Sequence, residues 1–217
     1  MHPRVRNVNL LVMNPKTPTL EGPRVRLEPL TLAHLRALEQ VALTPDAAPT
    51  WRYFRDTIRT PQDLRNYVQT ALRLEAEGTA MPWATILKAP VSGEPDKLIG
   101  TTRFMDLDLP NLTVEIGNTW LAPAYQGTGI NPEAKLLQLT YAFETLHLRR
   151  VALKTHHQNF QSQAAMRKLG AHYEGTFRNH YIMPDGSPRH SIWFSITAED
   201  WPKVKDLLTH RLHSPSS

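Results

Sequence analysis

A run of glycines and small polar residues at positions 126–131 is the first place where this chain could do chemistry. The run is Gln126, Gly127, Thr128, Gly129, Ile130 and Asn131. Asn131 suits the N-cap of a helix, Pro132 its first position and Glu133 the positive end of its dipole. Free backbone N–H groups in front of such a helix can bind a phosphate. An ordinary strand-to-helix turn that needs glycine only for its backbone angles would explain the run equally well.

The elements on either side must position this run. Residues 112–121 alternate between apolar and polar side chains, with Glu115 in the polar set, which predicts a strand with one buried face. Pro123 cannot donate to a sheet ladder, so the strand should end near Leu121. Apolar residues at helical spacing predict a long helix over 131–146. The glycine run therefore joins a strand to the beginning of a helix.

Composition limits the class of protein. The chain has 217 residues, of which 41% are hydrophobic, which suits one substantial core. It has no cysteine, so it has no disulfide, thiolate metal site or cysteine nucleophile. The apolar run at Leu10–Met13 is too short for a signal or membrane segment, and we expect a cytoplasmic protein with no membrane partner. The net charge of +5 would suit a polyanion, but the basic residues form no block.

The remaining patterns predict one α/β domain over residues 20–213. A strand–helix–strand order around the central helix implies a parallel pair, and the earlier strands should form an antiparallel meander. We expect strands at 25–30, 83–87, 98–104, 112–121, 150–155, 172–177 and 190–196, and helices at 31–43, 60–77, 131–146 and 159–169 and from 197 onward. Residues 1–19 are expected to be a flexible extension, with Met13 as an alternative start, and 214–217 a disordered tail.

With its neighbours, the 112–143 stretch resembles the acyl-CoA-binding core of the GNAT (GCN5-related N-acetyltransferase) superfamily. In that family a Gln/Arg-x-x-Gly-x-Gly/Ala loop joins the fourth strand to the third helix and holds the CoA pyrophosphate. Gln126 and Gly129 match this loop, whereas Asn131 stands where glycine or alanine is expected. Residues 21–30 and 195–205 are similar to the RimJ/RimL-like branch.

The resemblance implies a fold and a set of cofactor contacts. The fold is a mixed, mostly antiparallel central sheet of about seven strands, splayed between the fourth and fifth strands and flanked by helices. The co-substrate is acetyl-CoA, with no metal. The residues expected to bind it are Trp120, Leu121, Gln126, Gly127, Thr128, Gly129, Ile130, Asn131, Asn159 and Ser162.

A second part of the resemblance lies at the start of the next helix. The family places an asparagine there, beside the pantetheine arm, and in the RimJ/RimL branch a serine three residues later lies near the thioester sulfur. Asn159 and Ser162 match, although each also suits an ordinary first helical turn. Some members carry a tyrosine four residues after the serine as the acid that protonates the leaving thiolate. Here that position is Met166, which cannot donate a proton, so Ser162 or a water would have to do so.

Acyl transfer from a thioester to an amine needs a base for the amine and a site for the developing oxyanion. Glu115, on the strand before the loop, is the candidate base, and its alternative role is a carboxylate in an ion pair at the rim. Backbone N–H groups near Trp120 and Leu121, freed where the two strands diverge, would hold the thioester carbonyl. Catalysis of this kind is mainly positioning.

The acceptor pocket is harder to predict. Trp51, Tyr53 and Phe54 could line it, but packing in the core explains these aromatic residues at least as well. His156, at the end of a strand, could face the acyl pocket. The adjacent His156 and His157 point apart on a strand and do not form a metal-ligand pattern, so we expect no metal site.

The sequence therefore predicts an N-acetyltransferase that transfers an acetyl or other short acyl group from acyl-CoA to a primary amine of a protein N-terminus or a small molecule. A catalytically degenerate acyl-CoA-binding protein is the first alternative. A basic nucleic-acid-binding protein is the second and less favoured one, because the chain lacks a recognition motif. A homodimer is an open expectation, since dimers are common in this branch.

Overall fold

A computed structural model describes residues 16–91 and 93–213. The strands are β1 (Leu20–Glu21), β2 (Val25–Pro29), β3 (Met81–Leu87), β4 (Lys97–Asp108), β5 (Thr113–Leu121), β6 (Arg150–His156), β7 (His172–Ile182) and β8 (Pro188–Thr197). The α-helices are α1 (Leu35–Ala42), α2 (Pro61–Ala76), α3 (Ile130–Thr140), α4 (Phe160–Lys168) and α5 (Trp201–His213). A 3-10 segment covers Pro45–Tyr53, and a π-helical turn at Tyr141–Thr145 extends α3.

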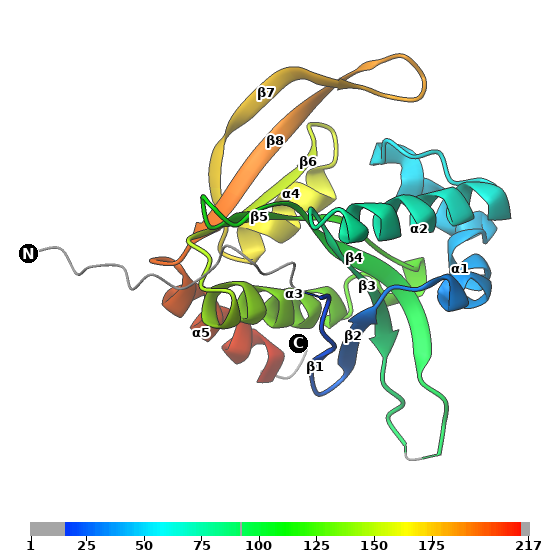
Figure 1. Cartoon of the computed structure of the whole chain (residues 1–217), viewed down its shortest axis with the longest axis horizontal. Helices are drawn as coiled ribbons and strands as arrows, with labels where there is room; N and C mark the ends of the chain where they lie inside the picture. Colours follow the sequence, from blue (N-terminus) through cyan, green and yellow to red (C-terminus); the bar gives the residue numbers. More distant parts are fainter. Residues whose placement is uncertain (1–15, 92, 214–217) are drawn as a thin grey trace, which may run out of the picture.

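The strands form one sheet that is divided into two parts. Its order is β1-β2-β3-β4-β5-β6-β8-β7, and every neighbouring pair is antiparallel except β5 and β6. These two strands pair only over Thr113–Glu115 and Arg150–Ala152 and then diverge (Figure 1). The mixed sheet, its parallel pair and its splay are confirmed. It has eight strands rather than seven because Leu20–Glu21 pairs with β2, ahead of the first predicted strand.

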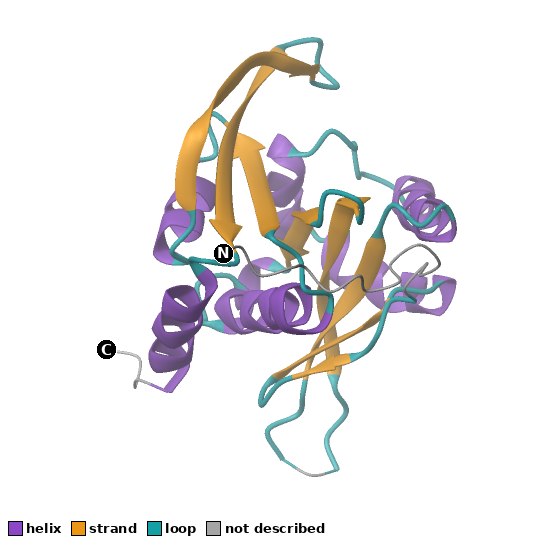
Figure 2. Ribbon diagram, turned by 60° about the vertical axis from the view of Figure 1, so that its left-hand side comes forward, coloured by secondary structure: helices purple, strands orange, loops and turns teal. Residues whose placement is uncertain are grey.

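Helices cover both faces of the sheet, and each face has its own core. Figures 1 and 2 show α1 and α2 on one side and α3 and α5 on the other. The first core packs Leu38, Leu64 and Val68 against Ala84 and Trp120. The second core includes Trp83, Phe104, Val114, Ile116, Leu139, Phe194 and Leu208. Burial of these apolar side chains, at about 25 cal/mol per Å², is what holds the helices on the sheet.

The alternation predicted for β5 fails at Asn118. This residue has φ 47°, and the pairing with β4 slips between Thr101–Trp120 and Arg103–Gly117, so the strand carries a β-bulge. Because the bulge adds one residue, Ile116 and Leu121 lie in the same core although their numbers differ in parity. The predicted single buried face is also wrong, because Val114 and Ile116 lie in one core, Trp120 lies in the other, and Glu115 is buried as well.

The N-terminal boundary differs from the expected one. Residues 1–15 and 214–217, assigned to an extension and a tail, lie outside the described residues. Residues 16–19 were also assigned to the extension, but Thr17 is buried and its hydroxyl donates to Glu75 on α2. The Pro18 carbonyl accepts a 2.7 Å hydrogen bond from Trp83 Nε1. The domain therefore begins before residue 20, because two hydrogen bonds fix this segment on α2 and β3.

Candidate active site

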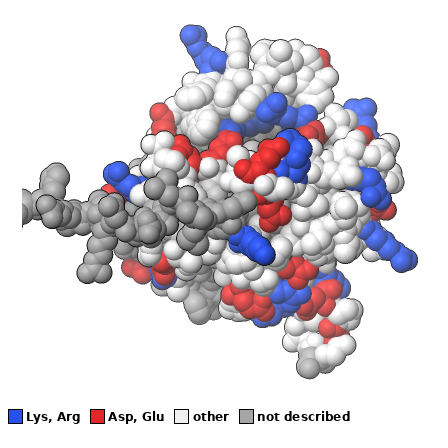
Figure 3. Space-filling model, viewed as in Figure 1, with Lys and Arg blue, Asp and Glu red and all other residues white. Residues whose placement is uncertain are grey.

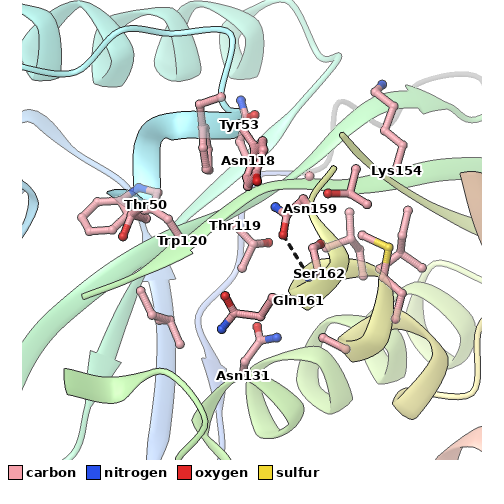
Figure 4. Close-up of a pocket in the computed structure, with 18 of the residues that line it drawn as sticks. Thr50, Tyr53, Asn118, Thr119, Trp120, Asn131, Lys154, Asn159, Gln161 and Ser162 are labelled. Carbon is pink, nitrogen blue, oxygen red and sulfur yellow. Dashed lines mark hydrogen bonds between the residues drawn. The ribbon is translucent and has the colours of Figure 1, made fainter. Parts of the chain in front are cut away.

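The divergence of β5 and β6 opens a cleft of about 1460 Å³. One side, which we call the loop side, consists of residues 126–131 and the first turn of α4 at 159–162. The other, the hairpin side, consists of residues 53–55 and the ends of β7 and β8 at 181–189. In Figure 4 Asn118, Thr119 and Trp120 of β5 lie between Asn131 and Tyr53. The strand with the bulge therefore connects the two sides.

The loop side is built around two glycines with left-handed backbone. Gly127 has φ 76° and Gly129 φ 81°, conformations that disfavour a side chain. A Cβ on Gly127 would meet no atom within 4 Å, so the backbone there faces open space. Gln126 braces the loop, because its Nε2 donates to the Leu121 carbonyl at 3.0 Å, and Thr128 Oγ1 donates to the Tyr125 carbonyl at 2.8 Å.

The helix begins earlier than the sequence indicated. Gly129 is the N-cap of α3, so Asn131 lies inside the first turn and the predicted Asn131 cap is wrong. The left-handed Gly129 lets the helix begin at once, and Ile130 turns into the core instead of the cleft. Asn131 lines the cleft, and its Oδ1 is buried without a hydrogen-bond partner among the described residues. A ligand donor group could satisfy this oxygen.

The sequence analysis did not assign Arg24 to this site, because more than 100 residues of sequence separate it from the glycine loop. Its Nε and backbone N–H, and the backbone N–H of Val25, all donate to the buried Glu133 carboxylate at 2.8–3.1 Å. This bonding fixes the beginning of β2 on the first turn of α3. A Cβ on Gly129 would lie 3.1 Å from Arg24 Nη2, so the half-exposed guanidinium lies beside the glycine loop. It adds positive charge where an anion would bind.

Lys135 on α3 is a buried cation in the wall of the cleft. Its Nζ donates to Thr119 Oγ1 at 2.8 Å, to Gln138 Oε1 at 2.9 Å and to Thr102 Oγ1 at 3.1 Å. None of these partners is a carboxylate, and burial lowers the pKa of Lys135 to about 7. The sequence analysis missed it because a lysine at this helical spacing is typical of an exposed face.

Asn159 is the N-cap of α4, as predicted. Its Oδ1 accepts the Ser162 backbone N–H at 3.0 Å, and Figure 4 shows both side chains at the edge of the cleft. Ser162 is half-buried and its hydroxyl makes no hydrogen bond among the described residues. Met166 lies one turn further along the same wall. The residues predicted from the second part of the resemblance therefore all line the cleft.

Glu115 is a buried member of an ion pair. Its Oε2 lies 2.5 Å from Lys154 Nζ on β6, and both side chains are less than 10% exposed. Burial raises the pKa of Glu115, and the Lys154 ammonium offsets part of that rise. Burial also opposes the charge on Lys154, but the Glu115 carboxylate reverses this and raises the pKa of the lysine. The ion pair predicted as the alternative is present, and it lines the cleft rather than the outer rim.

Gly117 leaves room for this carboxylate. A Cβ at this position would lie 2.4 Å from Met105 Sδ and 2.9 Å from Glu115 Oε1. Both contacts are closer than real Cβ atoms approach other atoms. A glycine two residues after Glu115 is therefore required for the carboxylate to occupy its present place.

The aromatic residues expected at the acceptor pocket divide into two groups. Tyr53 and Phe54 line the cleft. Trp51 does not, because it is buried against Trp120 at a ring distance of 4.9 Å and its Nε1 donates to the Ala42 carbonyl. His156 is also buried behind the wall, with its ring 5.1 Å from that of Tyr53. Trp51 and His156 therefore support the wall from behind.

The cleft also contains arginines to which the sequence analysis gave no role of their own. Arg189 of β8 is 8% exposed and Arg103 of β4 is 3% exposed, yet both line the cleft. Arg103 lies over the Tyr67 ring at 4.7 Å. Tyr181 lies opposite Arg189 in the hairpin, and Arg55 lies 4.2 Å from its ring. Single arginines on separate strands carry no spacing signal, so only the fold brings them together.

Two kinds of feature are absent from the described part of the chain. Among residues 16–91 and 93–213, no group of three His, Cys, Asp or Glu side chains is placed to hold a metal ion. In the same ranges no helix has the length and apolar character to cross a membrane.

Comparisons with known proteins agree on one family. The sequence model of the acetyltransferase (GNAT) domain matches residues 24–172. The chain is 33% identical over 108 residues to a putative ribosomal N-acetyltransferase, YdaF, of Bacillus subtilis. That match covers 50% of this chain and 58% of YdaF, so the chain spans little more than half of this curated relative.

Solved structures extend the likeness to nearly the whole chain. A GCN5-related N-acetyltransferase from Brucella melitensis is 29% identical with a TM-score of 0.83, covering 94% of this chain and 88% of that one. A structure of RimL, the ribosomal L7/L12 alpha-N-protein acetyltransferase, in complex with coenzyme A has a TM-score of 0.71. At 19% identity, over 84% of this chain and 99% of that one, it shows the shared fold. The chain belongs to the GNAT acetyltransferase family.

Proposed function

We propose that this protein transfers an acetyl or other short acyl group from acyl-CoA to a primary amine. The observation that carries the proposal is the single cleft in which the glycine loop, the first turn of α4 and the buried Glu115 all meet. Family membership supports the reaction class, and the amine acceptor is part of the proposal.

The loop side fits the phosphates of acyl-CoA. The N-terminus of α3 presents unpaired backbone N–H groups and the positive end of its dipole, and Gly127 leaves space in front of them. Gly129, Asn131 and the neighbouring Arg24 complete this site. Asn159 and Ser162 would border the arm that carries the thioester. Bound acyl-CoA supplies the activated acyl group.

Leu121 would stabilise negative charge on the acyl oxygen. The Ala122 N–H donates to the Ile99 carbonyl at 2.8 Å, so the alternation of an antiparallel ladder turns the Leu121 N–H away from β4. On that side β6 has already diverged, which leaves this donor free to act in the cleft. The N–H of Trp120 is directed toward β4, so of the two proposed donors we retain Leu121.

Glu115 would take the proton that the attacking amine must lose. Its raised pKa makes it a stronger base than an exposed carboxylate once it is ionised, and Lys154 keeps the ionised form accessible. Met166 in the same wall has no proton to give, so the departing thiolate would take its proton from a water, or from Ser162 with a solvent proton replacing the one that the hydroxyl gives up. Most of the rate enhancement would come from holding two substrates in one cleft.

The absence of cysteine allows a direct test. Thermal unfolding is first measured with acetyl-CoA, succinyl-CoA, propionyl-CoA and CoA, because a ligand bound only by the native state adds about 2.7 kcal/mol of stability at one hundred times its Kd. Release of CoA thiol is then followed with a thiol reagent against a panel of amines, with no signal from the protein itself. We expect stabilisation by acyl-CoA and amine-dependent thiol release.

Other results of these two assays would favour one of the two alternative functions. Stabilisation without thiol release for any amine would favour a degenerate acyl-CoA-binding protein. No stabilisation by any CoA would contradict the transferase proposal, and salt-sensitive binding to DNA or RNA would be tested next. On the face drawn in Figure 3, Lys and Arg are interspersed with Asp and Glu, which disfavours nucleic acid.

A further inference from the structure

Arg189 is a buried cation that forms no ion pair with a described carboxylate, although the charge of Glu115 acts on it from a distance. Its side chain lines the cleft and is 8% exposed. Its single hydrogen bond within the described ranges joins Nη1 to the Tyr53 carbonyl at 3.3 Å, and its Nε is buried without a partner. No described carboxylate forms an ion pair with it, although an arginine stays charged in proteins. A buried, unpaired guanidinium is costly unless an anion completes it.

Other cations lie close to Arg189. Tyr181 has three cations near its ring: Arg55 at 4.2 Å, Arg189 at 5.6 Å and Lys154 at 5.7 Å. Arg103 in the same cleft has no carboxylate partner among the described residues either. The buried carboxylate of this region, Glu115, already pairs with Lys154 at 2.5 Å. Asp106 lies 3.8 Å from the same lysine and Asp56 also lines the cleft, but no described carboxylate forms an ion pair with Arg189 or Arg103.

The phosphates of acyl-CoA do not account for this charge. The phosphate site proposed above lies on the loop side, at the N-terminus of α3, whereas Arg189 lies on β8 and bonds to the Tyr53 carbonyl. With acetyl-CoA as the donor, whose acyl group carries no carboxylate, the group that completes Arg189 belongs to the other substrate. A guanidinium that keeps N–H groups unpaired matches the planar geometry of a carboxylate, and one guanidinium balances one negative charge.

We propose that the amine acceptor carries a carboxylate that binds Arg189 while its amine faces Glu115. This inference rests on the proposed acyl transfer and names the acceptor class for the same cleft. The carboxylate could belong to a free amino acid or to an acidic residue close to the amino end of a peptide. Arg103 and Arg55 strengthen the positive potential that draws such an acceptor into the cleft.

The experiment compares matched amines that differ only in the carboxylate. Each α-amino acid is assayed beside its carboxamide, and peptides with Asp or Glu at the second or third position beside their Asn or Gln versions. Thiol release gives kcat and KM for wild type, Arg189→Gln, Arg189→Lys and the control Arg178→Gln. Arg178 is an exposed arginine of the same hairpin that does not line the cleft.

We expect carboxylate acceptors to be preferred by at least tenfold in kcat/KM. Arg189→Gln should remove that preference by raising KM for carboxylate acceptors, with a smaller change for neutral amines and no change in acetyl-CoA binding. Arg189→Lys should restore part of the preference, and Arg178→Gln should leave it unchanged. Preference for free amino acids or for acidic peptides would identify the source of the carboxylate.

Two results would overturn the inference and leave the acyl transfer standing. One is equal use of carboxylate and neutral amines, and the other is a carboxylate preference that survives Arg189→Gln. If no amine is acylated, the proposed function fails, and thermal unfolding with N-acetyl amino acids and their amides still tests the site. Stabilisation by the acids that is lost in Arg189→Gln supports it, and the absence of any such stabilisation contradicts it.

Discussion

Between Gln126 and Asn131 the cleft wall is mostly main chain, whereas across the cleft, at β7 and β8, it consists mostly of long charged and aromatic side chains. The first region gains its binding capacity from two left-handed glycines and the beginning of a helix. The second gains it from Tyr181 and Arg189 on a hairpin with Arg55 from a distant segment. Backbone groups would bind the CoA phosphates, which all acyl-CoA molecules share. Side chains can differ from one relative to another, and they would set the choice of acceptor.

The largest effect should come from Glu115, where the two regions meet. Glu115→Gln should lower kcat by about 10²–10³-fold without weakening acetyl-CoA binding, because it removes the base and keeps the shape. In wild type the rate should fall as the pH drops through the raised pKa of Glu115, since the base must be ionised, and this limb should vanish in the variant. Measurement of kcat as a function of pH for wild type and Glu115→Gln checks both the lower rate and the loss of the acidic limb.

The control is Asp106→Asn. The Asp106 carboxylate lies 3.8 Å from Lys154 Nζ and its side chain is 71% exposed, so it alters the charge around the same lysine without touching the base. We expect less than a twofold change in kcat. A large loss in this variant as well would mean that the ion pair, and not proton transfer, governs the rate.

A side chain added to the main-chain wall should act on acyl-CoA alone. Gly129→Ala places a Cβ at a φ of 81° and 3.1 Å from Arg24 Nη2, so we expect acetyl-CoA to bind about tenfold more weakly while KM for the amine is unchanged. Gly93→Ala, at φ 98° in the loop between β3 and β4, imposes a similar backbone strain away from the cleft. Calorimetric titration of both variants with acetyl-CoA separates the effect of backbone strain from the loss of contacts with the ligand. If both variants bind acetyl-CoA with the same Kd, the proposed role of the loop is contradicted.

Lys135 is buried in the cleft wall without a carboxylate partner, and its removal should change stability more than binding. Its folded-state pKa of about 7 lies below the ordinary value of 10.5, so between these values the unfolded chain binds more protons. Wild type should therefore become more stable as the pH rises from 7 to 10. Lys135→Met should be more stable by a few kcal/mol near pH 7 and lose this rise.

Urea unfolding from pH 6.5 to 9.5 measures the effect. The Thr102 and Thr119 hydroxyls bond each other at 2.7 Å, so the variant leaves no unpaired hydroxyl oxygen between them. A variant that is less stable than wild type at every pH would show that the hydrogen bonds of Lys135 outweigh the cost of burying it.

The smallest effect should come from Met166. Met166→Tyr places a phenol where some relatives have their acid, but if catalysis is mainly positioning, kcat should change by less than threefold. The assay is the thiol release described above, with Met166→Leu as the control for altered packing. A tenfold gain in the tyrosine variant alone would mean that proton supply limits the wild-type reaction.

The difference between the two regions explains what the sequence could predict. Gln126, Gly129, Asn159 and Ser162 lie in short motifs whose spacing is fixed by local backbone geometry, and all four line the cleft. Most strands and helices followed from periodicity and from caps such as Thr60, which accepts the Asp63 N–H at 3.2 Å. The eighth strand, β1, was not predicted because a segment of two residues is too short to show an alternating pattern.

The features of the site that the sequence did not predict depend mostly on contacts between distant segments. Asn118 inserts a bulge that no alternation pattern reveals, and this reverses the face to which the last part of β5 points. Arg24 just before β2, Arg103 on β4 and Arg189 on β8 reach the site from three separate segments. Trp51 and Tyr53 are two residues apart, and only the packing of the 3-10 segment on Trp120 decides which one is in the core and which one lines the cleft.

The short seam of three residue pairs between β5 and β6 has a consequence for steady-state kinetics. Since the strands separate beyond it, both sides open into one cleft that can hold donor and acceptor at the same time. The chain has no cysteine to store an acyl group between two half-reactions. Initial rates measured against both substrates should therefore give intersecting lines in a double-reciprocal plot, the signature of a ternary complex, rather than the parallel lines of a ping-pong enzyme.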